Sequence, residues 1–390
     1  MQLQLPESIF RIPHEPSAST ARLPRPMKTT TSLIRKLTAA TALLLTAMTA
    51  TSSAQTTATD PVGFVTLNVT GTGGTLATAV TFLGLGMARP VAYQGVADTV
   101  AGVTITSNSA TWTDNQFAST PAPGYFLEVT SGTQAGMMSM VVSCDQAGKT
   151  LTVSDDLTAA GVASGVSFKL RPNWSLATLF GSANAAGFGA GTTSTADTIS
   201  IYDATLGGGA GGYHQYFYSS GGLPGVGWRK VGGGNSDQAN TAIWLDDGLV
   251  VTRKQSANLA IVVNGAVKLG ATITPVILGP NFIGNVYPSG SITLGTSGLY
   301  TGNAATGVAP GNSSSADLLL IYNQTLGGGV GGYDQYFYSS GGLPGVGWRK
   351  IGAGNAPQDT VSLDSGKSIV IKRNSGGAFN WLVSQPFPNQ

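Results

Sequence analysis

The amino-acid sequence predicts an all-β protein, in which a small N-terminal β barrel or sandwich module precedes two related antiparallel β modules. Three observations lead to this prediction. Short segments in which apolar and polar residues alternate recur along the chain, separated by Gly, Asn and Asp turns. Glu occurs three times and charged residues make up 10% of the chain, so exposed helices would lack the residues that favour them. A long glycine-rich segment also occurs twice.

Residues 27–54 have the order of a secretory signal peptide. Three basic residues precede an apolar run at 37–50, and small residues at 52 and 54 flank a cleavage point. A Pro-rich polar leader has no place ahead of such a signal, so we expect residues 1–26 to be a mis-assigned upstream extension and Met27 to be the start. Cleavage near Ala54 would then release a secreted protein into the periplasm, onto the cell surface or into the medium.

The charge of the exported chain argues against nucleic acid as a partner. Removing residues 1–54 takes away six basic and two acidic residues, which changes the net charge from +2 to −2. Nucleic-acid binding needs phosphate neutralisation by many Lys and Arg side chains, and a net charge of −2 gives no support for it. No later stretch approaches the roughly 20 apolar residues of a membrane span. The single cysteine, Cys144, lies in the apolar alternation MSMVVSCDQ and is expected to be a buried strand thiol.

The N-terminal β module is expected over residues 55–172. Its first strand reads TDPVGFVTLNV at 59–69, where every second residue is apolar. Further short β patterns follow between 93 and 171, namely GVTITS, GYFLEVTSG, MMSMVVS, KTLTVS and VSFKLRP. Such close, regular spacing of strands and turns is typical of a small barrel or sandwich.

Two β repeat modules are expected next, over residues 173–264 and 265–390. TADTISIYDATLGGGAGGY at 195–213 aligns with SADLLLIYNQTLGGGVGGY at 315–333, an offset of 120 residues. Each copy reads as strand, glycine loop, aromatic strand, loop, Trp strand, turn and apolar strand. A period this long indicates two domain-sized modules and not a solenoid or propeller.

Identity between the copies is concentrated in one hairpin. GGYHQYFYSSGGLPGVGWRK at 211–230 returns as GGYDQYFYSSGGLPGVGWRK at 331–350, and the single change is His214 to Asp334. Outside 205–232 and 325–352 the copies agree only in pattern. Either this segment meets a demanding packing or binding requirement, or recent exchange between the copies has made it uniform. Both explanations stay open at the level of sequence.

Several kinds of chemistry are disfavoured by residue counts. Once the leader is removed, His214 and Cys144 are too few for a zinc site of several His or Cys, and we expect no catalytic residue, metal or cofactor. The second copy carries Asp334, so a histidine-dependent triad cannot occur in both copies. We therefore expect His214 to be an exposed strand residue, and its replacement by Asp to change stability by less than about 0.5 kcal/mol.

Two acidic pairs and two glycine runs could belong to a hydrolase or nucleotide site. Asp155-Asp156 and Asp246-Asp247 leave open the paired carboxylates of a glycoside hydrolase, because their separation in space is not visible in a sequence. A tight hairpin turn also accounts for Asp247-Gly248 and for the matching Ser365-Gly366. The runs GGGAGG and GGGVGG lack the Lys-Ser/Thr that follows in a phosphate-binding loop, so they are weak nucleotide sites.

The repeated hairpin supplies candidate ligand-binding aromatics. A strand over YHQYFYS has aromatic residues on both faces, because successive side chains point to opposite sides. One face must pack on a core, and the other could present rings to a sugar or to another protein. The alternative is an ordinary hairpin between two layers. The candidates are Tyr213, Tyr216, Tyr218 and Trp228 in the first copy and Tyr333, Tyr336, Tyr338 and Trp348 in the second.

The chain resembles a family of uncharacterised exported bacterial proteins. The resemblance rests on DPVGFVTLNV after the signal, on the central RPNWSLATLFG, and on the paired IYDATLGGG…GWRKVGGG and IYNQTLGGG…GWRKIGAG. It covers most of the exported chain and implies a β-rich protein with a duplicated C-terminal part, but no particular activity or site. The inserts GGGAGGYHQ and SSGGLPGVG depart from the family pattern.

The expected function is that of an exported, non-enzymatic structural or adhesive protein of the cell surface or extracellular matrix. Its expected partners are polysaccharide or other surface proteins. The alternative is a secreted protein that binds or degrades polysaccharide and uses the repeated aromatic hairpins. A carboxylate pair in a cleft would favour the enzyme, whereas an exposed aromatic strip would favour binding.

Overall fold

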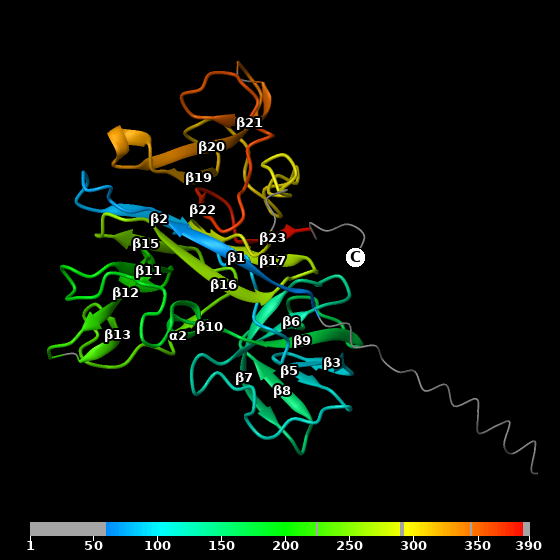
Figure 1. Ribbon diagram of the computed structural model, residues 1–390. Helices are drawn as coiled ribbons and strands as arrows, with labels where there is room; N and C mark the ends of the chain where they lie inside the picture. Colours follow the sequence, from blue (N-terminus) through cyan, green and yellow to red (C-terminus); the bar gives the residue numbers. More distant parts are fainter. Residues whose placement is uncertain (1–59, 224, 289–291, 344, 385–390) are drawn as a thin grey trace, which may run out of the picture. The chain divides into compact units, whose positions relative to one another are not determined.

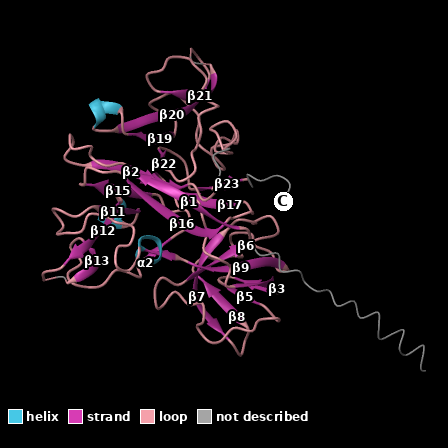
Figure 2. Cartoon of the chain, in the orientation of Figure 1, coloured by secondary structure: helices cyan, strands magenta, loops and turns pink. Residues whose placement is uncertain are grey.

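A computed structural model describes residues 60–223, 225–288, 292–343 and 345–384 (Figure 1). The expected leader and signal segments lie outside these residues. Strands dominate the described chain, and its helical segments are single turns of four or five residues (Figure 2). The all-β prediction is confirmed. None of the described helices has the length and apolar character needed to cross a membrane.

A seven-stranded antiparallel sheet forms a nearly closed barrel. Its strand order is β3-β9-β6-β7-β8-β5-β4. The two end strands, β3 and β4, are separated in the chain by Asp98 alone, so the sheet curls back on itself. Cys144 on β7 is buried in its core. The strands are β3 (Tyr93–Ala97), β4 (Thr99–Ala101), β5 (Thr104–Thr106), β6 (Tyr125–Val129), β7 (Met138–Asp145), β8 (Thr150–Val153) and β9 (Val166–Pro172).

The first repeat contains a five-stranded sheet in the order β13-β12-β11-β15-β2 and a two-stranded ribbon, β1-β16. A short helix, α2 (Leu176–Phe180), begins at Ser175, whose hydroxyl accepts a hydrogen bond from the Thr178 backbone N–H, and ends at Gly181. The strands are β1 (Val62–Val69), β2 (Ala79–Leu83), β10 (Trp174–Ser175), β11 (Thr198–Asp203), β12 (Gly212–Ser220), β13 (Val226–Lys230), β14 (Ala242–Ile243), β15 (Leu249–Arg253) and β16 (Leu259–Ala266); a helical turn, α3 (Leu206–Gly209), joins β11 to β12.

The second repeat has the same arrangement. Its sheet order is β21-β20-β19-β22-β18, and its ribbon is β17-β23. In this comparison β18 takes the place of β2, and β17 takes the place of β1. The elements are β17 (Thr272–Val276), β18 (Gly279–Gly284), β19 (Leu318–Asn323), η1 (Leu326–Gly329), β20 (Gly332–Ser340), β21 (Val346–Lys350), β22 (Ser368–Arg373) and β23 (Phe379–Val383).

The barrel is therefore an insertion within the first repeat. Strands β1 and β2 precede the barrel in the chain, yet they pair with β16 and β15, which follow it. Figure 1 shows these two blue strands beside the green strands of the first repeat. Sheet pairing thus crosses the boundary expected at residue 172, because the first repeat draws its opening strands from residues 62–83 and the rest from 174–266.

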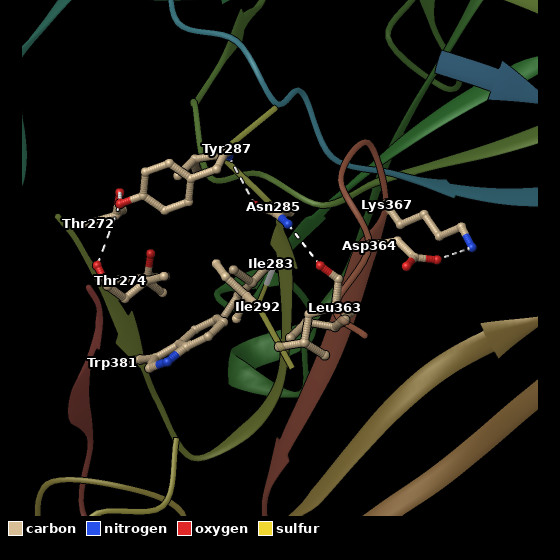
Figure 3. A pocket seen from close by; sticks show the side chains of 14 residues that line it. Thr272, Thr274, Ile283, Asn285, Tyr287, Ile292, Leu363, Asp364, Lys367 and Trp381 are labelled. Carbon is tan, nitrogen blue, oxygen red and sulfur yellow. Dashed lines mark hydrogen bonds and ion pairs between the residues drawn. The ribbon is translucent and has the colours of Figure 1, made fainter. Parts of the chain in front are cut away.

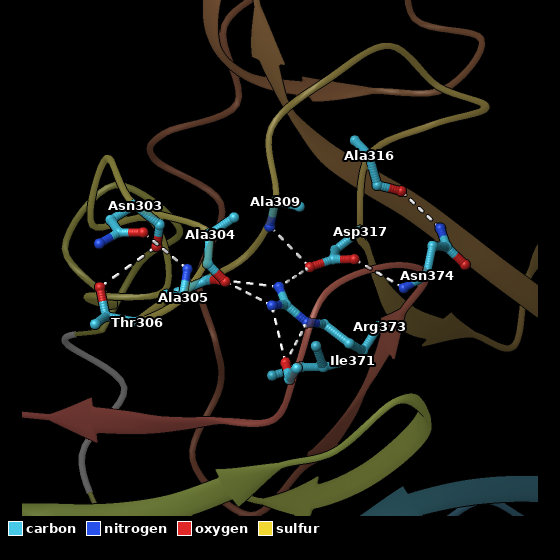
Figure 4. A network of polar contacts seen from close by, with 12 residues as sticks. Asn303, Ala304, Ala305, Thr306, Ala309, Ala316, Asp317, Ile371, Arg373 and Asn374 are labelled. Carbon is cyan, nitrogen blue, oxygen red and sulfur yellow. Dashed lines mark hydrogen bonds and ion pairs between the residues drawn. The ribbon is translucent and has the colours of Figure 1, made fainter.

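A buried Asp–Arg ion pair occurs at the equivalent place in each repeat. In the second repeat the Asp317 carboxylate accepts hydrogen bonds from Arg373 Nη1 at 2.6 Å and from the Ala309 backbone N–H at 2.7 Å (Figure 4). The first repeat matches it with Asp197 and Arg253, whose atoms lie 2.8 Å apart. Both carboxylates also accept from the backbone N–H of the residue after the arginine. The ion pair thereby holds the end of β15 against the loop that leads into β11, and the end of β22 against the loop that leads into β19.

A buried charge cluster connects the barrel to the chain segment between the repeats. Glu128 on β6 accepts hydrogen bonds from Arg171 Nε on β9, at 2.8 Å, and from Lys268 Nζ, beyond β16. Arg171 also pairs with Asp60, ahead of β1. Burial alone would raise the pKa of the Glu128 carboxyl, but the charges of Lys268 and Arg171 outweigh it and hold that pKa at about 2.

Candidate binding surface between the two repeats

Six aromatic rings meet where the two repeats contact each other. Phe82 of β2 stacks on Tyr322 of the second repeat, with ring centroids 4.8 Å apart, and Phe282 of β18 stacks on Tyr202 of the first repeat at the same distance. Tyr333 packs edge-on against Phe82 at 5.6 Å, and Tyr213 packs edge-on against Phe282 at 5.3 Å. Each repeat thus offers the same rings to the other, so the contact has an approximate two-fold symmetry.

Two glycines bring the backbones together at this contact. A Cβ on Gly84 would lie 3.0 Å from the Gly284 Cα, and a Cβ on Gly284 would lie 3.0 Å from the Gly84 Cα. Gly84 N donates to Gly366 O at 3.1 Å, and Gly284 N donates to Asp246 O at 2.9 Å. The sequence marks both positions, because the glycines end the related segments TFLG and NFIG. Glycine is required here for close approach.

The glycine loops make room for the stacked tyrosines. A Cβ on Gly211 would lie 1.8 Å from the Tyr202 hydroxyl oxygen, and a Cβ on Gly331 would lie 1.9 Å from that of Tyr322. Both glycines also have positive φ angles, 82° and 96°. Gly211 and Gly331, the fifth residues of GGGAGG and GGGVGG, therefore serve ring packing at the contact between the repeats.

Most of the predicted aromatic candidates are core residues. Tyr216, Tyr218 and Trp228 are buried in the first repeat, and Tyr336 and Trp348 are buried in the second. Tyr338 is half-buried and stacks on Tyr300. β12 and β20 are inner strands of their sheets, and the successive residues 216–219 and 336–339 are buried or half-buried, so both aromatic faces are covered beyond the first few residues of each strand.

Tyr213 and Tyr333 differ from the other candidates. They are 42% and 37% exposed, and the contact between the repeats brings them together. Partial burial is the main cause that raises the pKa of Tyr213 to about 12, and the nearby Tyr333 and Tyr202 add to the shift. Sequence reasoning missed their partners Phe82, Phe282 and the pair Tyr202 and Tyr322. The matching TFLG and NFIG segments and the matching IYD and IYN segments were the available signal.

The one difference in the repeated hairpin is matched by a second difference. His214 Nε2 lies 3.0 Å from Asp203 Oδ2. In the second repeat Asp334 instead accepts hydrogen bonds from Asn323 Nδ2 at 2.9 Å and from Lys350 Nζ at 2.8 Å. Asn323 occupies the position of Asp203. The acidic residue therefore lies on β11 in the first repeat, but on β20, the equivalent of β12, in the second.

This arrangement changes the expectation for His214→Asp. The substitution places a carboxylate beside Asp203, and like charges on neighbouring strands repel, so we expect a loss of about 0.5–1 kcal/mol in the free energy of unfolding. The double variant Asp203→Asn, His214→Asp recreates the second repeat and should recover most of that loss. Urea unfolding at pH 7 measures both. Equal losses in the single and double variants would contradict this account.

Two grooves flank the aromatic contact at equivalent places. One groove, of about 560 Å³, lies between β1, β2 and β19 and includes Asn68, Tyr322, Asp334 and Ser368 in its lining. The other, of about 280 Å³, lies between β17, β18 and the end of β11. By contrast, the cavity in the core of the second repeat measures about 30 Å³ and is too small for a sugar or nucleotide (Figure 3).

The structure brings together two of the acidic residues noted in the sequence. Asp155 and Asp246 line one cavity of about 320 Å³ together with Trp244. Asp155 accepts a hydrogen bond from the buried Ser139 hydroxyl at 2.5 Å, and Asp246 accepts one from Thr274 at 3.0 Å. Burial raises the pKa of Asp246, and burial together with the charge of Asp246 raises the pKa of Asp247 to about 7.

The described residues contain no group of three or more His, Cys, Asp or Glu side chains placed to hold a metal ion. No family model, curated protein or solved structure matches the chain.

Proposed function

We propose that the protein is an exported, non-enzymatic structural or adhesive protein of the cell surface or extracellular matrix. The signal-like segment supports export. The adhesive role is carried by one observation, the identical apolar tips of the two repeated hairpins. These tips comprise Leu223 and Val226 in the first repeat and Leu343 and Val346 in the second.

Core packing does not account for the identity of these tips. Leu223 and Leu343 are 93% and 92% exposed, and both valines are 64% exposed. Packing can preserve the buried tyrosines and tryptophans of the hairpin, but it places no demand on side chains that face solvent. Exposed apolar side chains that recur in both copies suit contact with a partner. Two tips on one chain can also bind a repetitive surface with a gain of about 10² to 10⁴ in avidity.

Sedimentation with cell-envelope fragments tests this role. The secreted protein is mixed with the fragments, and the bound fraction is compared for Leu223→Ser, Val226→Thr, for Leu343→Ser, Val346→Thr, and for all four changes together. Loss of either tip should remove most of the binding without lowering the melting temperature. Val262→Thr, at an exposed valine of β16, is the control. A fourfold variant that sediments like the unaltered protein would refute the proposed role.

A second candidate function is hydrolysis of polysaccharide at the Asp155–Asp246 cavity. Two carboxyl groups, of which Asp246 has a raised pKa, and a tryptophan in one cavity match the requirements of glycoside cleavage. Release of reducing ends from soluble glucans, xylan and chitosan tests it. Asp155→Asn and Asp246→Asn should each abolish release, whereas Asp156→Asn should not. Absence of release by the unaltered protein would leave the adhesive role as the sole candidate.

A further inference from the structure

We propose that the larger groove, between β1, β2 and β19, is a binding site for a neutral saccharide. The proposal does not depend on the hairpin tips, which belong to a different part of each repeat. At about 560 Å³ the groove is within the size range of small-molecule sites. Its lining contains hydroxyl, amide and aromatic side chains and one residue of each charge.

The polar groups of the groove suit a ligand rich in hydroxyls. Thr66 and Asn68 point outward from β1, where alternate residues face solvent. A threonine hydroxyl and an asparagine amide can each donate and accept hydrogen bonds, as sugar hydroxyls do. Tyr322 adds an aromatic ring, and its hydroxyl donates to Gln324 Oε1 at 3.1 Å. Rings combined with a few fixed polar groups are typical of sites for small polar ligands.

The charges in the groove favour a neutral ligand over a phosphate. Asp334 is already paired with Lys350 at 2.8 Å, and Lys367 is paired with Asp364 at 2.7 Å. The lining residues Asp334 and Lys367 cancel in formal charge. An anion would meet one cation that already has a carboxylate partner, whereas phosphate sites gather several charged or backbone donors.

The smaller groove, between β17, β18 and the end of β11, lies at the equivalent place. It has about half the volume, Ala204 takes the place of Gln324, and Pro275, Ile277 and Pro280 make its lining more apolar. We therefore expect one saccharide site per chain, although the repeats are related. Asn323 and Asp334 contribute to this difference, because they line the larger groove and are replaced by Asp203 and His214 in the first repeat.

Isothermal titration of the secreted protein with cellohexaose, maltohexaose, xylohexaose, mannohexaose and the N-acetylated hexamer hexa-N-acetylchitohexaose tests the site. At least one should bind. Asn68→Ala, Thr66→Ala and Tyr322→Phe should each weaken it about threefold to tenfold, the usual effect of losing one neutral hydrogen bond. Tyr202→Phe, at the equivalent tyrosine, and Asn264→Ala, on the exposed face of β16, are matched controls and should leave affinity unchanged.

Asn68→Ala separates a ligand-binding role from a structural one. Because Asn68 is exposed on β1, the melting temperature should stay the same while saccharide affinity falls. Variants of the hairpin tips should bind the saccharide normally, so failure of the adhesive role would be seen separately. The proposal is overturned if none of the five hexasaccharides binds at millimolar concentration, if Asn68→Ala and Thr66→Ala bind unchanged, or if inorganic phosphate competes for the site.

Discussion

Glu128→Gln should destabilise the protein by about 3–5 kcal/mol at pH 7, the usual cost of removing one partner from a buried ion pair. Arg171 and Lys268 are both fully buried beside this carboxylate, and glutamine would leave them without its charge. The neighbouring half-buried Lys169, which pairs with Asp60, is the control. Lys169→Gln should cost less than about 1 kcal/mol, as partly exposed pairs do. Urea unfolding measures both, and similar small losses would contradict the assignment.

The same substitution should change the pH dependence of stability. The pKa of Glu128 is about 2 in the folded protein, below its ordinary value of 4.5. A depressed pKa means that the stabilising contribution is complete above the unfolded value and is lost as the pH falls toward 2. The unaltered protein should therefore lose stability between about pH 5 and pH 2. Glu128→Gln should show a shallower loss over that range, and equal slopes would rule out this role for the carboxylate.

Tyr216→Ala together with Tyr218→Ala should cause early melting. Both rings are buried in the core of the first repeat, and replacing a buried aromatic residue by Ala costs about 3–5 kcal/mol. The pair Tyr336→Ala and Tyr338→Ala should cost less, because Tyr338 is half-buried. Tyr213→Ala, at a ring that is 42% exposed, should cost less still. Thermal melting followed by near-ultraviolet circular dichroism ranks the three variants, and an unchanged melting temperature in the first would contradict core packing.

The strands and the duplication could be predicted because both are local properties of the sequence. Alternation and turn residues mark the strands of the barrel, and the 120-residue offset marks the two repeats. The pairing of β2 with β15 could not be predicted in this way. It joins residues on either side of the barrel, and the local signal for it is the short similarity between TFLG and NFIG.

The candidate site was less accessible to prediction. A strand with aromatic residues on both faces does not reveal which faces are covered, because this depends on what packs on each face of the sheet. In β12 the side chains of Tyr216, Phe217 and Tyr218, which alternate between the two faces, are all buried, so Tyr216 and Tyr218 are core residues. The larger groove is built from β1, β2 and β19, which are distant in the chain, and no local motif links them. One signal for the charge cluster was available, the lone Glu128 within the apolar strand YFLEV.

The insertion of the barrel lengthens the loop that must close to complete the sheet of the first repeat. Thr81 on β2 must find Val251, whereas the equivalent Asn281 on β18 pairs with Ile371, much closer in the chain. Closing a longer loop costs more conformational entropy and slows folding. The barrel offsets this cost, because its first and last strands are neighbours and Tyr93 pairs with Leu170. Once the barrel has folded, its two ends lie side by side, and the chain between β2 and β10 behaves as a short connection.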